Sequence, residues 1–417
     1  MKRGGLLSGL FAKRHARAEP TPAMSRPDHS LLILPLGLTA VGLVLVYSAS
    51  SILGLTQHGD AFFYVSRQAV RAVIGVFAFV FFARLDYHKL GRASWWLFGL
   101  MLLGLLAMAA LGVTHEVRGA RRWVSVLGMA IQPTEMARVV TVIFLSAFLA
   151  RRADRIESLT QTYLPALAIL GAAAALVAIQ PNLSSAAVLF AVGATLLFFA
   201  GARWLHLGGT AGLGALGFVA MIVHYDYQRE RLLHHIQFLF TGKLDSLGAG
   251  WQLEQSLIAI GSGGLFGRGF GRGMQKFLFL PDPHTDFILA IAGEEGGLIA
   301  TAGLLAALLF FVWRAYRAGL RAPDLFGTLV AAGLATQLAL YSFVNMGVAT
   351  GLLPTTGLPL PFISYGGSAL VMNLAAAGIL VNISRQAEAT AGRSPRSRIL
   401  VPTGLARRPK PTWEALK

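Results

Sequence analysis

Ten apolar stretches separated by short polar segments constrain this chain more than any other feature of its sequence. Each holds about 17 or more residues with few charges, the length that an α-helix needs to cross a membrane. With 55% hydrophobic and only 13% charged residues, the composition is typical of an all-α polytopic membrane protein and excludes an ordinary soluble enzyme. The predicted spans are residues 31–55, 62–83, 94–112, 133–150, 163–179, 184–200, 205–223, 285–316, 326–349 and 368–383.

The distribution of positive charge predicts how these spans are oriented. A formal charge of +17 would suit a nucleic-acid-binding protein, but cytoplasmic loops of membrane proteins also collect Lys and Arg. If the N-terminus is cytoplasmic, most of the 36 basic residues fall in cytoplasmic segments, and the outer turns 180–183 and 350–367 carry none. We therefore expect both termini in the cytoplasm, no nucleic-acid partner, and a large extracytoplasmic loop between spans seven and eight.

This orientation divides the chain into a membrane domain and two tails. Residues 29–385 form the predicted ten-span domain, in which residues 224–284 are the outer loop. Residues 1–28 and 386–417 are basic and contain proline, and we expect them to be disordered near the anionic inner leaflet.

Several charges do not follow the inside-positive pattern. Arg118, Arg121 and Arg122 lie in the outer loop after the third span, and Glu135 and Arg138 follow at the start of the fourth. Arginine binds phosphate with two parallel hydrogen bonds, so a lipid-linked diphosphate would suit the three loop arginines; the alternative is structural ion pairs with nearby carboxylates. Because Glu135 and Arg138 are three residues apart on one helix face, we expect them to pair with each other.

Span eight carries two acidic residues, Glu294 and Glu295, well below its outer end. A charge at such depth costs about 3 kcal/mol or more unless it is paired or faces water. A polar cavity inside the bundle would account for both; an ion-coupled transport site is the competing interpretation.

Residues 351–368 hold three prolines and several glycines among apolar residues, which forbids a helix. Non-helical backbone at membrane depth must be buried in protein or line a cavity. The other Gly-rich segment, residues 261–273, is not a nucleotide loop, because it lacks the Gly-Lys-Ser/Thr signature and follows no strand. The absence of cysteine excludes disulfides and thiol chemistry.

Taken together, seven motifs resemble the SEDS family (shape, elongation, division and sporulation proteins) over about residues 30–385, and more closely its division members than its elongation members. The motifs are Tyr-Ser-Ala-Ser at 47–50, Gly-Ala-Arg-Arg-Trp at 119–123, Gln-Pro-Thr-Glu at 132–135, Gln-Pro-Asn at 180–182, Asp245 with Gly-Ala-Gly at 248–250, His-Thr-Asp-Phe at 284–287 with Glu-Glu at 294–295, and Pro-Leu-Pro-Phe-Ile-Ser-Tyr-Gly-Gly-Ser at 359–368.

The resemblance implies a peptidoglycan glycosyltransferase of the cytoplasmic membrane. Such an enzyme polymerises lipid II on the outer face, at the division septum, together with a class B penicillin-binding protein and other division proteins. The family's essential aspartate falls on Asp245. Three positions depart from the usual pattern: Ser246 replaces Pro, Arg138 replaces Lys, and Asn182 replaces an Asp found in many members, which puts a second acidic role at that turn in doubt.

The chemistry of lipid II suggests roles for these residues. An α-linked donor and a β-1,4 product require inversion, which one displacement with a single base provides. We expect Asp245 to be that base, with a turn-capping aspartate as the alternative. The substrate-binding residues that we expect are Arg118, Arg121, Arg122, Arg138, His284, Asp286, Glu294, Glu295, Ser364 and Tyr365.

No metal-ligand cluster is readable in the sequence, although a divalent cation such as Mg²⁺ or Mn²⁺ would suit a diphosphate leaving group. Two other functional classes remain open. One is a flippase or transporter of lipid-linked precursors, and the other is a non-catalytic division scaffold.

The predicted orientation can be tested with single cysteines, since the chain has none of its own. Ser246→Cys should react with a membrane-impermeant thiol reagent in intact cells, whereas Ser394→Cys should react only after the cells are opened. Labelling of both positions from the same side would overturn the predicted arrangement.

Overall fold

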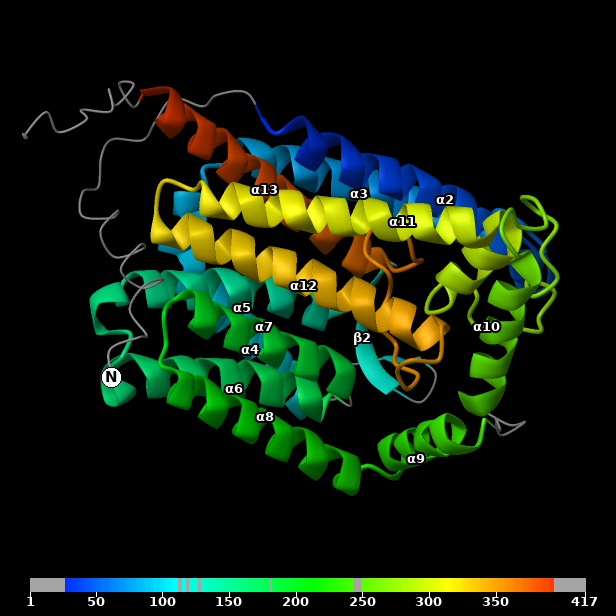
Figure 1. Ribbon diagram of the computed structural model, residues 1–417, viewed down its shortest axis with the longest axis horizontal. Coiled ribbons are helices and arrows are strands. Elements are labelled where there is room, and N and C mark those ends of the chain that lie inside the picture. The colour runs from blue at the N-terminus through cyan, green and yellow to red at the C-terminus, as the bar shows by residue number, and fades with distance from the viewer. Residues whose placement is uncertain are drawn as a thin grey trace, which may run out of the picture.

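The computed structural model describes residues 27–111, 115–117, 120–126, 129–180, 182–242 and 249–393. Long helices running along the horizontal axis of Figure 1 dominate this part of the chain. Nine of the described helices are long and apolar enough to cross a membrane, and a tenth, α7, has 17 residues.

Each of the ten predicted spans corresponds to one helix, which confirms the predicted fold class. The spanning helices are α2 (His29–His58), α3 (Phe63–Arg84), α4 (Tyr87–Leu111), α5 (Pro133–Ala150), α6 (Leu164–Ile179), α7 (Leu183–Phe199), α8 (Trp204–His224), α11 (Ile288–Leu320), α12 (Leu325–Ala349) and α13 (Gly367–Arg393). A short 3₁₀ turn, η1 (Ala153–Arg155), and a π turn, η2 (Leu159–Tyr163), precede α6.

Two further helices and a small sheet lie at the end of the bundle that the charge pattern assigns to the outside (Figure 1). The helices are α9 (Asp226–Thr241) and α10 (Ala249–Gly263), both within the predicted outer loop. The antiparallel strands β1 (His115–Val117), β2 (Ala120–Val126) and β3 (Met129–Ile131) form a sheet in the order β1-β2-β3. This sheet was not predicted from the sequence, because β1 and β3 have only three residues each and the seven residues of β2 do not alternate between polar and apolar.

The interior of the bundle is formed by α5, α12 and α13. Their most apolar windows are 78%, 78% and 83% buried, against 11% for the peripheral α8. Small residues allow such close packing of helices: a Cβ at Gly378 of α13 would lie 2.4 Å from the Phe79 carbonyl oxygen of α3. These three helices therefore set the positions of the side chains described below.

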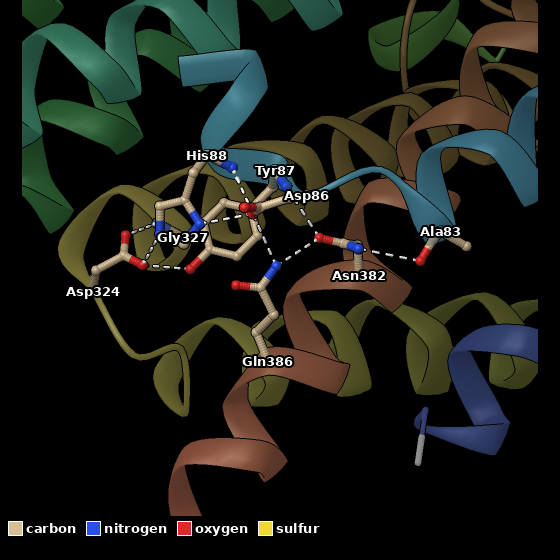
Figure 2. A network of polar contacts seen from close by, with 8 residues as sticks. All are labelled: Ala83, Asp86, Tyr87, His88, Asp324, Gly327, Asn382 and Gln386. Carbon is tan, nitrogen blue, oxygen red and sulfur yellow. Dashed lines mark hydrogen bonds and ion pairs between the residues drawn. The ribbon is translucent and has the colours of Figure 1, made fainter. Parts of the chain in front are cut away.

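A polar network joins the helix ends at the opposite, predicted cytoplasmic, end of the bundle (Figure 2). His88 lies between two carboxylates, with Nδ1 2.8 Å from Asp86 Oδ1 and Nε2 3.0 Å from Asp324 Oδ2. A histidine can donate from both ring nitrogens only when it is protonated, so this arrangement favours the imidazolium.

The same network ties α13 to the turn between α3 and α4. Gln386 donates to Asp86 over 3.0 Å, and Asn382 donates to the Ala83 carbonyl over 3.1 Å. Tyr87 donates its hydroxyl to Asp324, which also accepts the Gly327 N–H and so caps α12. Three separate chain segments are thereby held together by hydrogen bonds to two carboxylates.

This network predicts acid sensitivity. Burial alone would raise the pKa of Asp86 and of Asp324, yet hydrogen bonds from Gln386 and His88 to the first, and from His88 and Tyr87 to the second, lower both pKa values. A carboxyl group with a lowered pKa stabilises the fold above its unfolded pKa, about 3.9, and loses that contribution as the pH falls through the folded value. The melting temperature in detergent should therefore fall steeply below about pH 4.

Asp324→Asn should lower the melting temperature at neutral pH and make its acid dependence shallower. The matched control is Glu157→Gln, because Glu157 belongs to an exposed pair with Arg203 and should leave the pH profile unchanged. Identical acid profiles for the wild type and Asp324→Asn would show that the network does not carry this dependence.

Candidate active site

The half of the predicted non-helical segment that is nearer to α13, residues 358–364, is packed inside the outer end of the bundle, whereas residues 352–357 are half-buried or exposed. Leu360, Phe362 and Ile363 are at most 2% exposed, although they precede α13 without helical structure. Asn345 of α12 supplies hydrogen bonds that this segment needs, because its side-chain amide donates over 2.9 Å to the carbonyls of both Leu358 and Asp286. The prediction of buried irregular backbone is confirmed for residues 358–364.

Ser364 and Tyr365 take part in the same packing. The Ser364 hydroxyl accepts the Leu360 N–H at 2.9 Å, and its carbonyl accepts a hydrogen bond from Gln68 of α3 at 3.2 Å. The Tyr365 N–H donates to the His284 carbonyl at 2.8 Å. Ser364 is buried and bonded to its own segment, whereas the Tyr365 ring is only half-buried.

Aromatic rings gather around that tyrosine. The Tyr365 ring centroid lies 5.2 Å from that of His284 and 5.6 Å from that of Tyr64. The guanidinium of Arg71, which is half-buried on α3, lies 5.2 Å from the Tyr365 ring centroid. The structure thus brings together two of the predicted substrate-binding residues, His284 and Tyr365, beside an arginine of the second span.

Glu135 and Arg138 form the predicted ion pair at the start of α5. Arg138 Nη2 lies 2.5 Å from Glu135 Oε2, and both side chains are less than 5% exposed. Arg138 also donates to Asn373 of α13 at 2.7 Å, and its guanidinium lies 4.3 Å from the Tyr341 ring centroid of α12. Arg138 Nε and Nη1 are buried and have no hydrogen-bond acceptor among the described residues.

Glu294 and Glu295 are buried. Their depth in span eight predicted a polar cavity around them, whereas in the structure other parts of the chain surround both carboxylates. Glu295 accepts from Ser48 of α2 at 2.7 Å and lies 3.2 Å from Lys276 Nζ. Glu294 accepts the Met274 N–H at 2.7 Å and lies 3.7 Å from Arg268. The Gly-rich segment after α10 therefore folds over both carboxylates, a long-range contact that residue spacing does not reveal.

Backbone pairing strengthens this contact where α11 bends. Gly297 has a φ of 68°, which interrupts the helix at a residue that tolerates left-handed backbone. Leu298 N–H donates to the Gly264 carbonyl at 2.9 Å, and Arg268 N–H donates to the Glu294 carbonyl at 2.9 Å. The Gly-rich segment thus replaces helical hydrogen bonds that the bend removes.

Arg231 of the outer helix α9 contacts the 351–368 segment. It donates to the Thr355 carbonyl at 3.2 Å, and its guanidinium lies 4.3 Å from the Tyr227 ring centroid. Burial lowers the pKa of Arg231, while Tyr227 and the negative charge of Asp286 oppose that shift. Arg231 therefore connects α9 to the 351–368 segment, and Asp286 favours its charged form.

The other predicted residues are only partly described. Arg121 and Arg122 are in β2, and Glu116 is the register partner of Arg121. The structure describes the backbone of these three residues but not their side chains. Arg118, Asp245 and Ser246 lie outside the described residues. Asn182 caps α7 by accepting the Ser185 N–H at 3.4 Å. An asparagine at this position therefore caps the helix, and the cap needs no carboxylate.

Four site residues were not predicted from the sequence: Gln68, Tyr341, Asn345 and Asn373. Each is a polar side chain inside a predicted span. Polar side chains are rare inside spans, and this rarity could have indicated their role. In the described residues, no group of three or more His, Asp or Glu side chains is arranged to hold a metal ion.

Comparisons with known proteins agree over almost the whole membrane domain. The profile of the FtsW, RodA and SpoVE family, described as "Cell cycle protein", matches residues 28–389. The chain is 39% identical to stage V sporulation protein E of Bacillus subtilis, covering 88% of this chain and 99% of that protein. It is 37% identical to the probable peptidoglycan glycosyltransferase FtsW of Geobacter metallireducens, covering 88% and 97%.

Two solved structures resemble the fold. One, described as "Structural coordination of polymerization and crosslinking by a peptidoglycan synthase complex", has a TM-score of 0.70 at 28% identity and covers 87% of this chain and 98% of its own. The rod shape determining protein RodA of Thermus thermophilus has a TM-score of 0.63 at 26% identity, covering 86% and 97%.

The buried pair of α5 leads to a prediction on stability. Arg138→Met should destabilise the protein by about 3–5 kcal/mol, because Glu135 would remain buried without its cation. Adding Glu135→Gln should recover much of that loss, which thermal unfolding in detergent would measure. Arg203→Met, in a pair whose side chains are both 61% exposed, is the matched control and should cost about 1 kcal/mol or less. A double variant no more stable than Arg138→Met would contradict the pairing argument.

Proposed function

The chain belongs to the FtsW, RodA and SpoVE family of cell cycle proteins, and from this membership we propose that it is a peptidoglycan glycosyltransferase. The reaction is the polymerisation of lipid II into β-1,4 glycan strands at the outer end of the bundle. The observation that carries the proposal is the near full-length similarity to proteins named as FtsW glycosyltransferases. The enzyme works at the cytoplasmic membrane, at the division septum, with both termini inside.

The displacement that we propose inverts the donor sugar in one step. Asp245 removes the proton from the acceptor hydroxyl, the acceptor oxygen bonds to the anomeric carbon, and undecaprenyl diphosphate leaves with the bonding electrons. In the sequence, Asp245 falls between α9 and α10, and both of these helices are at the outer end of the bundle. A positioned base of this kind contributes about 10²–10⁴ in rate.

Cationic side chains at the same end are suited to the diphosphate. Two guanidinium nitrogens of Arg138, Nε and Nη1, are buried without an acceptor in the described part of the site, and Arg71 lies half-buried beside Tyr365. Guanidinium groups bind phosphate oxygens in a bidentate way, with charge-assisted hydrogen bonds. We assign the diphosphate to Arg138 together with Arg118, Arg121 and Arg122, and the wall of the site to His284, Ser364 and Tyr365.

The acidic residues of α11 receive an indirect role. Because Glu294 and Glu295 hold the Gly-rich segment that follows α10, they position the outer loop rather than contact the donor. Asp286 has a similar role through Arg231 of α9.

The partner that we propose is a class B penicillin-binding protein, which would crosslink the strands that this enzyme polymerises. A solved relative is described as a peptidoglycan synthase complex that coordinates polymerization and crosslinking, which supports this pairing. Other division proteins would join the same assembly.

Purified full-length protein supplied with labelled lipid II in detergent tests the reaction class. Glycan polymer is the expected product, and no ion gradient is needed, because transfer from a diphosphate is downhill. Leaflet exchange of lipid II in vesicles without polymer would indicate a flippase. Partner binding with neither activity would indicate a scaffold.

The central prediction concerns Asp245→Asn. The amide keeps the size of the side chain but cannot accept the proton, so polymerisation should fall by about 10²-fold or more. Expression, partner binding and lipid II binding should stay near the wild-type level. The matched control is Asp226→Asn, the same change at an exposed aspartate that pairs with Arg229 on α9. If Asp245→Asn polymerises lipid II at the wild-type rate, another residue is the base. If the variant instead loses expression or partner binding, Asp245 has the turn-capping role.

A further inference from the structure

A cavity of about 360 Å³ opens at the end of the bundle opposite the candidate active site. It lies between the start of α4, the end of α5 and the start of α12. Its walls combine apolar side chains with polar ones, and His88 and Asp324 in Figure 2 belong to it. Arg92, Arg151, Ala147, Ala150 and Phe326 also line the cavity.

The carboxylate oxygens of Asp324, which lines this cavity, already have hydrogen-bond donors in the protein. Asp324 Oδ1 accepts the Gly327 N–H at 2.8 Å, and Oδ2 accepts from Tyr87 and faces His88 at 3.0 Å. The other ring nitrogen of His88 is 2.8 Å from Asp86. The two carboxylates and the imidazolium therefore form a closed network at the edge of the cavity.

The two arginines that line the cavity have no carboxylate partner in the described part of the chain. Arg92 is exposed and makes no ion pair with any residue in the described part of the chain, and Arg151 donates only to the Gly91 carbonyl, at 2.9 Å. Arg151 is bonded to the residue that precedes Arg92, and both arginines line the cavity. Neither is paired with a carboxylate in the described part of the chain, so both can receive an anionic ligand.

Exposed tryptophans place the cavity at the level of the lipid headgroups. Trp95 and Trp96 follow Arg92 by one turn of α4, and both are more than half exposed. Trp204 at the start of α8 and Trp313 near the end of α11 are exposed at the same end of the bundle. Tryptophan is enriched at the membrane–water interface, so these side chains mark the boundary beside which the two arginines lie.

We propose that this cavity binds the phosphate headgroup of an anionic phospholipid. The phosphate lies between Arg92 and Arg151, and the glycerol and upper acyl carbons lie against Ala147, Ala150 and Phe326. Basic pockets between spanning helices are suited to anionic headgroups, and arginine contacts phosphate in a bidentate way. The site is independent of lipid II chemistry, because it occupies the other end of the bundle.

The test uses the purified full-length protein in detergent, titrated with short-chain phosphatidylglycerol, phosphatidylcholine or inorganic phosphate. Saturable binding of phosphatidylglycerol, at least about tenfold tighter than that of the other two ligands, is expected. Since the protein is in micelles, the result does not depend on which end of the bundle faces the cytoplasm. Equal binding of phosphatidylcholine, or inorganic phosphate bound as tightly as the lipid, would overturn the assignment to an anionic lipid.

Variants locate the binding to this cavity. Arg92→Gln and Arg151→Gln should each weaken phosphatidylglycerol binding about tenfold, because each removes a charge-assisted contact, while Arg92→Lys should retain part of the affinity. Arg321→Gln is the matched control, the same change at an exposed arginine outside the cavity, and should bind as the wild type does. Since Arg92 has no ion pair in the described structure, its variant should keep the wild-type melting temperature. Unchanged affinity in both Gln variants would overturn the proposal.

Discussion

The absence of water inside a bilayer is the constraint on which the rest of this structure depends, since every backbone polar group there must find a partner in the protein. Helices satisfy that demand by themselves. The two irregular segments at the outer end do not, and other elements supply their bonds. Asn345 donates to two carbonyls around the 351–368 segment, and the Gly-rich segment pairs with α11 where Gly297 bends it. The candidate active site lies where the chain is not helical and where other elements supply the hydrogen bonds of its backbone.

Charged side chains are paired at both ends of the bundle, where they are buried at the outer end and partly buried at the opposite end. Glu135 is paired with Arg138 on its own helix, whereas Glu294 and Glu295 are bonded to a segment about twenty residues before them in the chain. At the other end, His88 joins two carboxylates from different turns. A buried ion pair gains little net stability, but removing one partner is costly. These contacts therefore specify which segments meet more than they add to the free energy of unfolding.

The two ends of the bundle are suited to different ligands. At the outer end, the buried Arg138 and the half-buried Arg71 lie beside aromatic rings. At the opposite end, Arg92 and Arg151 face a shallow cavity beside exposed tryptophans. Helices α4, α5 and α12 border that cavity, and α5 and α12 also carry Arg138 and Tyr341. The same helices thus position groups for a lipid-linked substrate at one end and for a membrane lipid at the other.

The sequence by itself determined the ten spans, the Glu135–Arg138 pair and the non-helical backbone of the 351–368 segment, because each follows from a local pattern of hydropathy, helical spacing or proline content. Only the tertiary structure decided that the Gly-rich segment covers Glu294 and Glu295, that Asn345 and Asn373 serve the site, and that β1, β2 and β3 form a sheet. Those features depend on contacts between residues far apart in the chain, or on strands whose residues do not alternate between polar and apolar. Depth in the membrane indicated that Glu294 and Glu295 need polar partners, but it could not distinguish a cavity from a folded segment, because the cost of burying a charge is relieved equally by either.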